Sequence, residues 1–269
     1  MNMLKISIVV SFHIFLSLLC HVDCHNNLSN DDSSAGIVAL ILARGGSKGI
    51  KMKNIQMIDG TTLLGISLKE IQKAEIFESI WVSTDDDEIA KEGLKYNANI
   101  HKRDPQHARD ESKSIDAVQE FLLNHPNISR LALIQCTSPF ISHQYLREAF
   151  HKFTNRDCVF SAVKSFKLRW KYADDKRMNV VPINFDYRYR PRRQDWDGEF
   201  IEAGMFYFTK RELLNEGLFQ NDNCDIVEIK NEDSLEIDRP SDLELARMLN
   251  KHRKTLDADD KSNFCSTGK

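Results

Sequence analysis

Continuous runs of apolar residues alternate with amphipathic stretches along most of this chain. A run with few polar interruptions is typical of a strand that is buried on both faces of a sheet. The clearest runs are Ile37–Ile41, Ile80–Thr84, Leu131–Gln135 and Cys158–Val163. Between them, apolar residues recur every three or four positions, which predicts helices. These sets are Leu64, Leu68 and Ile71, and Ile115, Val118 and Leu122.

This alternation predicts an α/β fold, in which a single domain holds a mostly parallel sheet with helices on both faces. At 269 residues, the chain is long enough for one sizeable domain of this kind. In such sheets, ligands bind beyond the carboxyl ends of the strands. The polar residues that follow each predicted strand are therefore the first candidates for a functional site.

A glycine-rich, cationic segment, Leu42–Asn54, follows the first predicted strand. Glycines let backbone N–H groups approach an anion closely, and four cations of the segment supply charge for phosphates. The spacing is not that of a Walker A loop, because Lys48 precedes Gly49, and it does not follow the dinucleotide pattern Gly-x-Gly-x-x-Gly. The segment is a phosphate-binding candidate, with a plain polar turn as the alternative. The four cations are Arg44, Lys48, Lys51 and Lys53.

Two other predicted strands also end in polar residues. After Leu131–Gln135, the run Gln135–Pro139 is either part of a site or a helix cap made by Ser138 or Ser142. After Ile80–Thr84, Asp85 and Glu88 have the spacing of a capping box. The alternative is a metal site at Asp85 and Asp87, because Asp-x-Asp holds Mn²⁺ in many glycosyltransferases.

The region 164–200 interrupts the alternation and predicts an inserted arm. Phe185, Tyr187 and Tyr189 alternate with charged residues, which predicts a half-buried strand. The arm also contains the cationic run Arg190–Asp195, for which a solvated turn and a nuclear-import signal are the alternatives. Fixed guanidinium groups stabilise developing negative charge without reorganisation, so this run is a catalytic candidate.

Glu236 and Asp238 form a candidate metal site near the end of the chain. They are separated by one residue, and on a strand such residues point to the same face. Two carboxylates together with substrate phosphates are the usual way in which proteins hold Mg²⁺. A last helix follows, for which Ser241–Glu244 predicts a capping box.

The first residues predict entry into the secretory pathway. Lys5, the apolar stretch Ile6–Leu19 and a cleavage site at Val22–Cys24 give residues 1–24 the pattern of a signal peptide, with an uncleaved Golgi-type anchor as the alternative. The apolar stretch is shorter than the roughly 20 residues that span a bilayer, so we expect no stable transmembrane span. Residues 25–35 are predicted to form a flexible linker, residues 36–251 the domain, and residues 252–269 a disordered tail.

Further features refine this picture. Asn27 and Asn127 each begin a glycosylation sequon. The net charge of −3 gives no case for nucleic-acid binding. The cysteines beyond the leader are predicted to be buried thiols, although a disulfide is possible in an oxidising compartment. These cysteines are Cys136, Cys158, Cys224 and Cys265.

Several motifs, in order along the chain, resemble those of the CMP-sialic acid synthetases, the N-acylneuraminate cytidylyltransferases. They are the segment Leu42–Asn54, the run Gln135–Pro139, the run Arg190–Asp195 and the carboxylate pair. The resemblance covers roughly residues 36–250. Glu236 departs from the family, which has Asp-Ile-Asp where this chain has Glu-Ile-Asp, so its charge lies one methylene further from the backbone.

The resemblance implies a Rossmann-like nucleotidyltransferase that converts CTP and N-acetylneuraminate to CMP-N-acetylneuraminate and pyrophosphate, with Mg²⁺ or Mn²⁺ as cofactor. It also implies that the polar stretch 101–114, which residue types alone predict to be a solvated loop, lines the substrate pockets. The implied substrate-binding residues are Arg44, Ser47, Lys48, Asn54, Arg103, Ser112, Ser114, Gln135, Thr137, Ser138 and Gln194. The implied catalytic residues are Lys53, Arg192 and Arg193, and the implied metal ligands are Glu236 and Asp238.

We further expect a homodimer in which the arm packs on the partner, and a location in the Golgi lumen rather than the nucleus. Three alternative functions stay open. One is a cytidylyltransferase for a related sugar of the Kdo type. The second is a Golgi glycosyltransferase that uses Asp85 and Asp87, and the third is a non-catalytic secreted protein that binds sugars or nucleotides, as the departure at Glu236 suggests.

Overall fold

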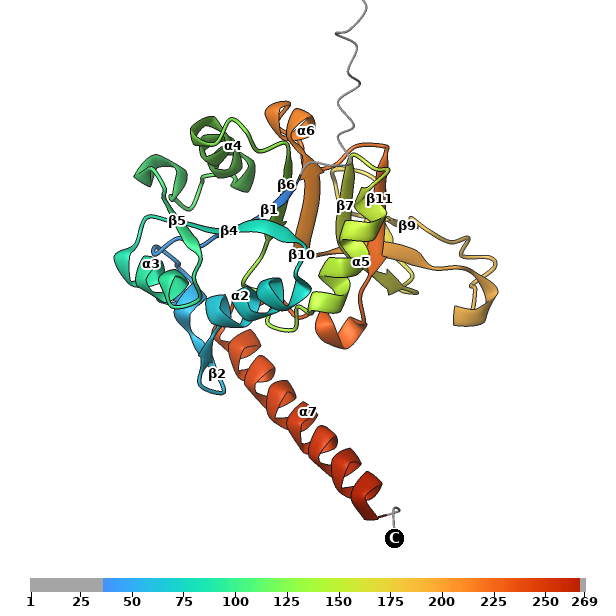
Figure 1. Cartoon of the computed structure of the whole chain (residues 1–269). Coiled ribbons are helices and arrows are strands. Elements are labelled where there is room, and N and C mark those ends of the chain that lie inside the picture. Colours follow the sequence, from blue (N-terminus) through green and yellow to red (C-terminus); the bar gives the residue numbers. More distant parts are fainter. Residues whose placement is uncertain (1–35, 267–269) are drawn as a thin grey trace, which may run out of the picture. The chain divides into compact units, whose positions relative to one another are not determined.

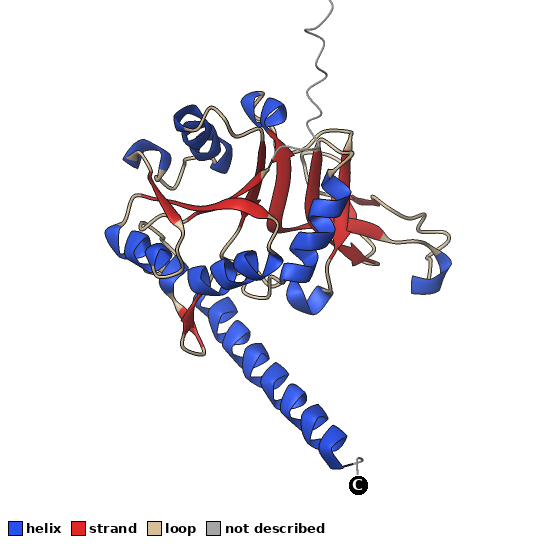
Figure 2. Cartoon of the chain, viewed as in Figure 1, coloured by secondary structure: helices blue, strands red, loops and turns tan. Residues whose placement is uncertain are grey.

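The computed structural model describes residues 36–266, so the predicted leader (1–24), the linker (25–35) and the sequon at Asn27 lie outside the described residues. The described chain is built on one seven-stranded sheet and two small two-stranded sheets (Figures 1 and 2). The strands are β1 (Ile37–Leu42), β2 (Met57–Ile58), β3 (Thr61–Thr62), β4 (Phe77–Thr84), β5 (Asn99–Lys102), β6 (Arg130–Ile134), β7 (Cys158–Ser165), β8 (Trp170–Tyr172), β9 (Val180–Pro182), β10 (Glu199–Lys210) and β11 (Cys224–Glu228). The helices are α2 (Leu63–Ala74), α3 (Asp87–Leu94), α4 (Ser114–Asn124), α5 (His143–Phe153), α6 (Arg211–Asn215) and α7 (Pro240–Ser266).

The large sheet has the strand order β11-β7-β10-β6-β1-β4-β5. β1 pairs in parallel with β4 and β6, β4 with β5, and β7 with β11, whereas β10 runs antiparallel to both of its neighbours. The prediction of a mostly parallel sheet is confirmed. The carboxyl ends of β1, β4, β5 and β6 consequently lie at one edge of the sheet.

Helices cover both faces of this sheet (Figure 2). Along β1, Ile37, Ala39 and Ile41 pack with α2, α3 and α5 on one face, while Val38 and Leu40 pack with α4 and α6 on the other. All five side chains are at most 4% exposed. Burial on both faces is the reason why this strand has no polar alternation in its sequence.

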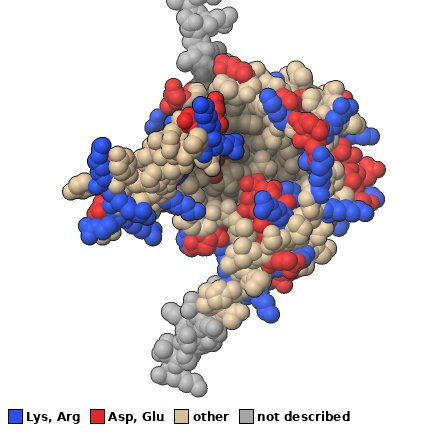
Figure 3. Space-filling model, turned by 180° about the vertical axis from the view of Figure 1, so that it is seen from behind, with Lys and Arg blue, Asp and Glu red and all other residues tan. Residues whose placement is uncertain are grey.

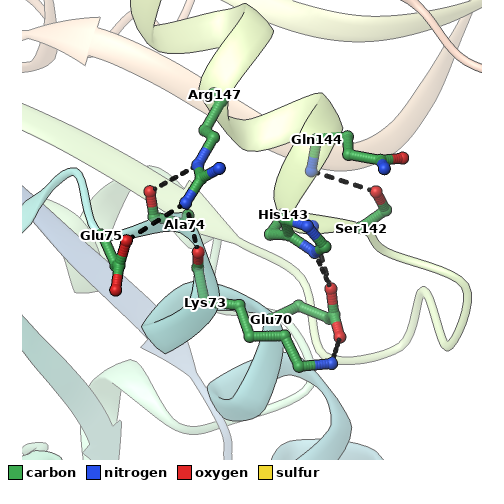
Figure 4. Close-up of polar contacts among 8 residues, drawn as sticks. All are labelled: Glu70, Lys73, Ala74, Glu75, Ser142, His143, Gln144 and Arg147. Carbon is green, nitrogen blue, oxygen red and sulfur yellow. Dashed lines mark hydrogen bonds and ion pairs between the residues drawn. The ribbon is translucent and has the colours of Figure 1, made fainter.

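Polar contacts join the end of α2 to α5 (Figure 4). Arg147 donates to the backbone carbonyls of Lys73 and Ala74, which would otherwise end the helix without partners. Glu70 accepts from the backbone N–H of His143 and also pairs with its ring Nδ1. These contacts hold the first turn of α5 in place. The polar run Gln135–Pro139, which lies between β6 and α5, is held with it.

The helix caps differ in part from those predicted. Ser142 caps α5 by accepting from a backbone N–H of the first turn, which selects it over Ser138. The predicted box led by Asp85 is wrong, because Asp86 caps α3 with its carboxylate. At α7, the carboxylate of Asp242 accepts from two backbone N–H groups that precede the helix, in place of the box predicted at Ser241–Glu244.

The region 164–200 contains the β8–β9 hairpin, and the strand predicted around Phe185 is wrong. Residues 185–189 form turns and bends. Tyr187 and Tyr189 are 61% and 86% exposed. In the part of the chain that the structure describes, no neighbouring strand forms backbone hydrogen bonds with this segment, and neither of its faces packs on a hydrophobic core. Alternation of apolar and polar residues alone was not enough to make a strand here.

The end of the domain also differs from the prediction. α7 runs from Pro240 to Ser266, so residues 252–266 continue a helix where a disordered tail was expected. Pro240 starts the helix at the position where its missing N–H costs nothing. Leu243 and Ala246 are buried against the domain, which nucleates the helix, and propagation from an existing turn is favourable even for a polar sequence.

Two of the cysteines that were predicted to be free thiols form a disulfide. Cys158 and Cys224 are bonded, and they are also partners in the β7–β11 pairing. They are 66 residues apart in the sequence, so no local pattern indicated the pair. Among the described residues, Cys136 remains a free and buried thiol.

Candidate functional site

The segment Leu42–Asn54 packs tightly on neighbouring loops at the carboxyl end of β1. The N–H of Gly45 donates to the carboxylate of Asp85 at 2.9 Å. A Cβ at Gly45 would lie 2.8 Å from that of Asp86, and one at Gly49 would lie 2.6 Å from the carbonyl oxygen of Asp238. Both positions therefore require glycine. Gly49 lets the segment Leu42–Asn54 pack against the backbone of Asp238, one of the two predicted metal ligands.

A cavity of about 230 Å³ lies between this segment and the stretch 103–114. We call it the first cavity. It brings together most of the predicted substrate-binding residues and one predicted catalytic residue, Lys53. The prediction that the stretch 101–114 is only a solvated loop is wrong, because its residues form one wall. The predicted residues that line the cavity are Arg44, Ser47, Lys53, Asn54, Arg103, Ser112, Ser114, Gln135 and Thr137.

A carboxylate balances part of the positive charge of the first cavity. Asp110 lies 2.6 Å from Nη1 of Arg44 and 2.8 Å from Nζ of Lys48. These two cations lower the pKa of Asp110, so it is ionised. Sequence analysis missed Asp110, although it lies between two predicted site residues of the same stretch. Basic and acidic side chains are likewise mixed on the hollowed face in Figure 3.

Asn54 is held in one orientation within the wall of the first cavity. Its Nδ2 donates to the backbone carbonyl of Arg44 at 2.9 Å, and its Oδ1 accepts from Sγ of Cys136 at 3.2 Å. Burial raises the pKa of Cys136 to about 12, so the thiol stays protonated and remains a donor. Arg103 forms another part of the wall, where burial lowers its pKa to about 10 and leaves it positively charged.

A second cavity of about 670 Å³ adjoins the first, because Ser114 and Gln135 line both. Two of its walls come from β10, the antiparallel strand, and from the chain that follows β11. Of its polar lining residues, sequence analysis predicted Ser114, Gln135 and Glu236 and missed the others; the β10 residues among them lie on an antiparallel strand, where no ligand site was expected. Its other polar lining residues are Ser165, Lys167, Glu202, Tyr207, Asn231, Ser234 and Glu236.

The predicted metal ligands lie between the cavities and the cationic segment. The chain around them is an extended loop rather than a strand, but it alternates as predicted, because Ile237 is fully buried while Glu236 and Asp238 are exposed. Glu236 accepts from the hydroxyl of Thr137 at 3.3 Å, and Asp238 pairs with Nζ of Lys53 at 3.1 Å.

The electrostatics of Glu236 and Asp238 favour a bound cation. Although Glu236 is exposed as a residue, desolvation of its carboxylate against the neighbouring chain raises its pKa, and the charge of Asp238 raises it further. A cation between them would relieve this repulsion. Among residues 36–256, no group of three or more His, Cys, Asp or Glu side chains is placed to hold a metal ion.

Some predicted site residues lie outside both cavities. Lys48 has a side chain that is 80% exposed, and Ser138 is buried behind the wall. Arg192, Arg193 and Gln194 lie exposed on the arm. Arg192 pairs with Asp195 at 2.9 Å, and the guanidinium of Arg193 lies 4.7 Å from the ring centre of Phe166. Arg192 and Arg193 therefore line neither cavity.

A further prediction concerns the surface. Asn127 lies exposed in the turn between α4 and β6, so its sequon is accessible. Within residues 36–266, no helix has the length and apolar character needed to cross a bilayer.

Comparison with known proteins places this geometry in a wider context. The family model described as cytidylyltransferase matches residues 38–262. The N-acylneuraminate cytidylyltransferase A of Danio rerio is 42% identical over 221 residues, which cover 80% of this chain and 51% of that protein. The corresponding enzyme of Oncorhynchus mykiss is 40% identical over 75% of this chain and 47% of its own length. The chain thus spans about half the length of these curated relatives.

A more distant relative and a solved structure are matched over nearly their whole length. A pseudaminic acid cytidylyltransferase of Campylobacter jejuni is 31% identical over 80% of this chain and 96% of that protein. The solved structure of a CMP:2-keto-3-deoxy-manno-octonic acid synthetase complexed with CTP superposes with a TM-score of 0.61 at 14% identity, covering 81% of this chain and all of that one. At this identity the structural match supports the fold, and it agrees with the architecture described above.

Proposed function

This chain belongs to the cytidylyltransferase family, and on that premise we propose that it activates N-acetylneuraminate, forming CMP-N-acetylneuraminate and pyrophosphate from CTP and the free sugar. The observation that carries the proposal is the pair of adjoining cavities that share Ser114 and Gln135. The first cavity has the cations for a triphosphate, and the larger second cavity has the polar lining expected for a nine-carbon sugar. The shared wall is where the two substrates would meet.

The reaction forms a bond between the anomeric oxygen of the sugar and the α-phosphorus of CTP, and it breaks the bond from that phosphorus to the bridging oxygen of pyrophosphate, while the proton of the anomeric hydroxyl is released to solvent or to the departing pyrophosphate. Arg44 and Lys53 would bind the triphosphate, and Gln135 would hold the sugar in line with it. Such transfers depend mainly on positioning and on stabilisation of charge. Binding of the triphosphate would have to separate Asp110 from the cations that it now neutralises.

A divalent cation, Mg²⁺ or Mn²⁺, is part of the proposal. Glu236 and Asp238 would hold it together with the phosphates, and it would neutralise charge on the departing pyrophosphate. Lys53, which now pairs with Asp238, would then be released toward the phosphates.

The arm supports a homodimer as the active form. It exposes large apolar side chains, which a second copy of the chain would cover; these include Trp170, Tyr172, Met178, Val180, Tyr187 and Tyr189. Arg192 and Arg193 lie outside the cavities of their own subunit. We therefore propose that the arm packs on the partner and delivers these guanidinium groups to the partner's departing pyrophosphate.

We place the protein in the secretory pathway, in the Golgi lumen. Two observations support this proposal beyond the leader sequence. The Cys158–Cys224 disulfide is typical of proteins from oxidising compartments, and the sequon at Asn127 is accessible in a turn. A nuclear location for the basic run of the arm does not agree with these features.

The test is a pyrophosphate-release assay on protein purified from a secretory expression system, with CTP and Mg²⁺ or Mn²⁺. We expect turnover with N-acetylneuraminate to exceed that with Kdo or pseudaminic acid, the sugars suggested by the more distant relatives. Arg44→Ala should lower kcat/KM for CTP strongly. The matched control is Lys91→Ala, since Lys91 pairs with Glu88 on α3, outside both cavities.

Other outcomes would favour the alternatives. Tight binding of CTP without pyrophosphate release in either metal would overturn the proposal in favour of a non-catalytic binding protein. Preference for Kdo would reassign the sugar. Loss of activity in Asp87→Ala with a mild effect of Arg192→Ala would point to a metal site at the end of β4 instead. Gel filtration that gives an active monomer would overturn the homodimer.

A further inference from the structure

A line of buried polar side chains runs behind the wall of the first cavity. Ser83, at the end of β4, and His101, on β5, are partners in the parallel pairing of these strands. Their side chains meet on one face of the sheet, where Ser83 Oγ lies 3.0 Å from His101 Nδ1. Ser83 is fully buried and His101 is 7% exposed. Polar groups at such depth are costly unless they bond one another.

Arg103 is attached to this pair. Its Nε donates to Ser83 Oγ at 3.0 Å, its Nη2 donates to the backbone carbonyl of Ser83, and its own backbone N–H donates to the carbonyl of Thr84. An arginine N–H can only donate, so Ser83 Oγ accepts it and lies between Arg103 and His101, whichever ring nitrogen carries the proton. The guanidinium is thereby anchored by one edge while it lines the first cavity.

Residues of α4 contact the other side of the His101 ring. The carboxylate of Glu120 accepts from the backbone N–H of Asp104 at 2.8 Å and lies 4.0 Å from His101 Nε2. Phe121 packs its ring edge-on to that of His101, with ring centres 5.3 Å apart. The imidazole thus has a hydrogen-bonding neighbour at Nδ1, a carboxylate near Nε2 and an aromatic ring beside it. It cannot rotate without breaking several contacts.

We propose that Ser83 and His101 are positioning residues, which hold the Arg103 guanidinium in the orientation that binds the acceptor atoms of the nucleotide. The identity of that nucleotide as CTP rests on the proposed function, whereas the anchoring of Arg103 does not. Neither positioning residue lines the cavity, so neither contacts substrate. An arginine on a flexible side chain loses less freedom on binding when its rotamer is already fixed.

The test is a double-mutant cycle on CTP binding, measured by calorimetry. Ser83→Ala should raise the Kd for CTP about tenfold, the size expected for the loss of a hydrogen bond to a charged group. In an Arg103→Gln background, Ser83→Ala should change the Kd less than twofold, because the residue that Ser83 positions is gone. His101→Phe, which keeps the ring packing and loses Nδ1, should also raise the Kd with kcat at saturating CTP nearly unchanged.

The control is Ser67→Ala, which removes a fully buried hydroxyl that has no hydrogen-bond partner and should leave the Kd unchanged. If Ser83→Ala weakens binding equally in both backgrounds, or if it lowers thermal stability without changing the Kd, the positioning role is overturned. If Ser83→Ala does not fold, His101→Phe in the same two backgrounds gives the same comparison.

A spectroscopic measurement tests this inference independently of the proposed function. In ¹⁵N-arginine-labelled protein, the Arg103 Nε–H signal, assigned by its loss in Arg103→Lys, should exchange slowly with water and should broaden or exchange rapidly in Ser83→Ala. Failure of the wild type to bind CTP would overturn the proposed function and leave this readout intact. A rapidly exchanging Nε–H in the wild type would overturn the anchoring itself.

Discussion

The Cys158–Cys224 disulfide should contribute a large share of the stability of this domain. It closes a loop of 66 residues. In the chain-entropy model, a loop of that length restricts the unfolded state enough to stabilise the fold by about 4 kcal/mol. For a domain of this size, each kcal/mol shifts the unfolding midpoint by about 2–4 °C, so replacing both cysteines by serine should lower Tm by roughly 10 °C.

The disulfide also has a place in the fold that links it to function. It joins the first residues of β7 and of the edge strand β11. The chain that follows β11 carries Asn231, Ser234 and Glu236 into the second cavity. Loosening this edge should therefore raise the KM for the sugar, which is proposed to occupy the second cavity, more than the KM for CTP, which is proposed to bind in the first cavity.

The assay is thermal unfolding by circular dichroism on the wild type and on the Cys158→Ser/Cys224→Ser variant, each with and without reductant. The double variant with added reductant is the control, since it has no bridge to lose and should show no further shift. A difference in Tm below about 2 °C between the wild type and the variant would refute the entropy argument. Equal changes in both KM values would refute the link to the second cavity.

Three further predictions address individual residues. Asp110→Asn should tighten binding of inorganic tripolyphosphate about threefold, the scale of a partly exposed ion pair, and an unchanged Kd by calorimetry would contradict the role of Asp110 as a counter-ion. Gly49→Ala should destabilise the domain by about 1–3 kcal/mol in urea unfolding, because its Cβ would lie 2.6 Å from the carbonyl oxygen of Asp238. The control is Gly46→Ala, whose Cβ would meet nothing within 4 Å and which should be tolerated. Equal destabilisation by the two variants would contradict the packing argument. Cys136 is buried and its pKa is raised to about 12, so it should resist alkylation by iodoacetamide at pH 8 in the native state and react in denaturant. Peptide mass spectrometry measures the labelling of Cys136, and rapid labelling of the native protein would contradict the prediction.

The periodicity of the sequence predicted the framework of the fold. Continuous apolar runs identified β1, β4, β6 and β7, and helical spacing identified α2 and α4. These features are local, because burial of a strand or of one helix face needs a pattern within a few consecutive residues. The rule that parallel strands end at the same edge made Arg44 and Gln135 site candidates, whereas the family resemblance implied that Asn54 and Gln135 bind substrate.

Local patterns failed where the outcome depended on neighbours. The alternation around Tyr187 predicted a strand, but no partner strand is there to pair with it. The spacing of Asp85 to Glu88 predicted Asp85 as the cap, but the carboxylate of Asp85 accepts from the N–H of Gly45, and Asp86 caps α3 instead. The polar sequence after Lys251 gave no sign of the helix that propagates from the buried start of α7.

The sequence by itself determined the α/β framework, the glycines and cations of the phosphate-binding candidate, and the resemblance that its motifs carry. Only the tertiary structure decided that Asp110 neutralises those cations, that Cys158 bonds Cys224, and that Ser83 and His101 anchor Arg103. The reason is physical. Each of these contacts joins residues from different elements, and the distance between them is set by strand order and register, which no short segment of the chain contains.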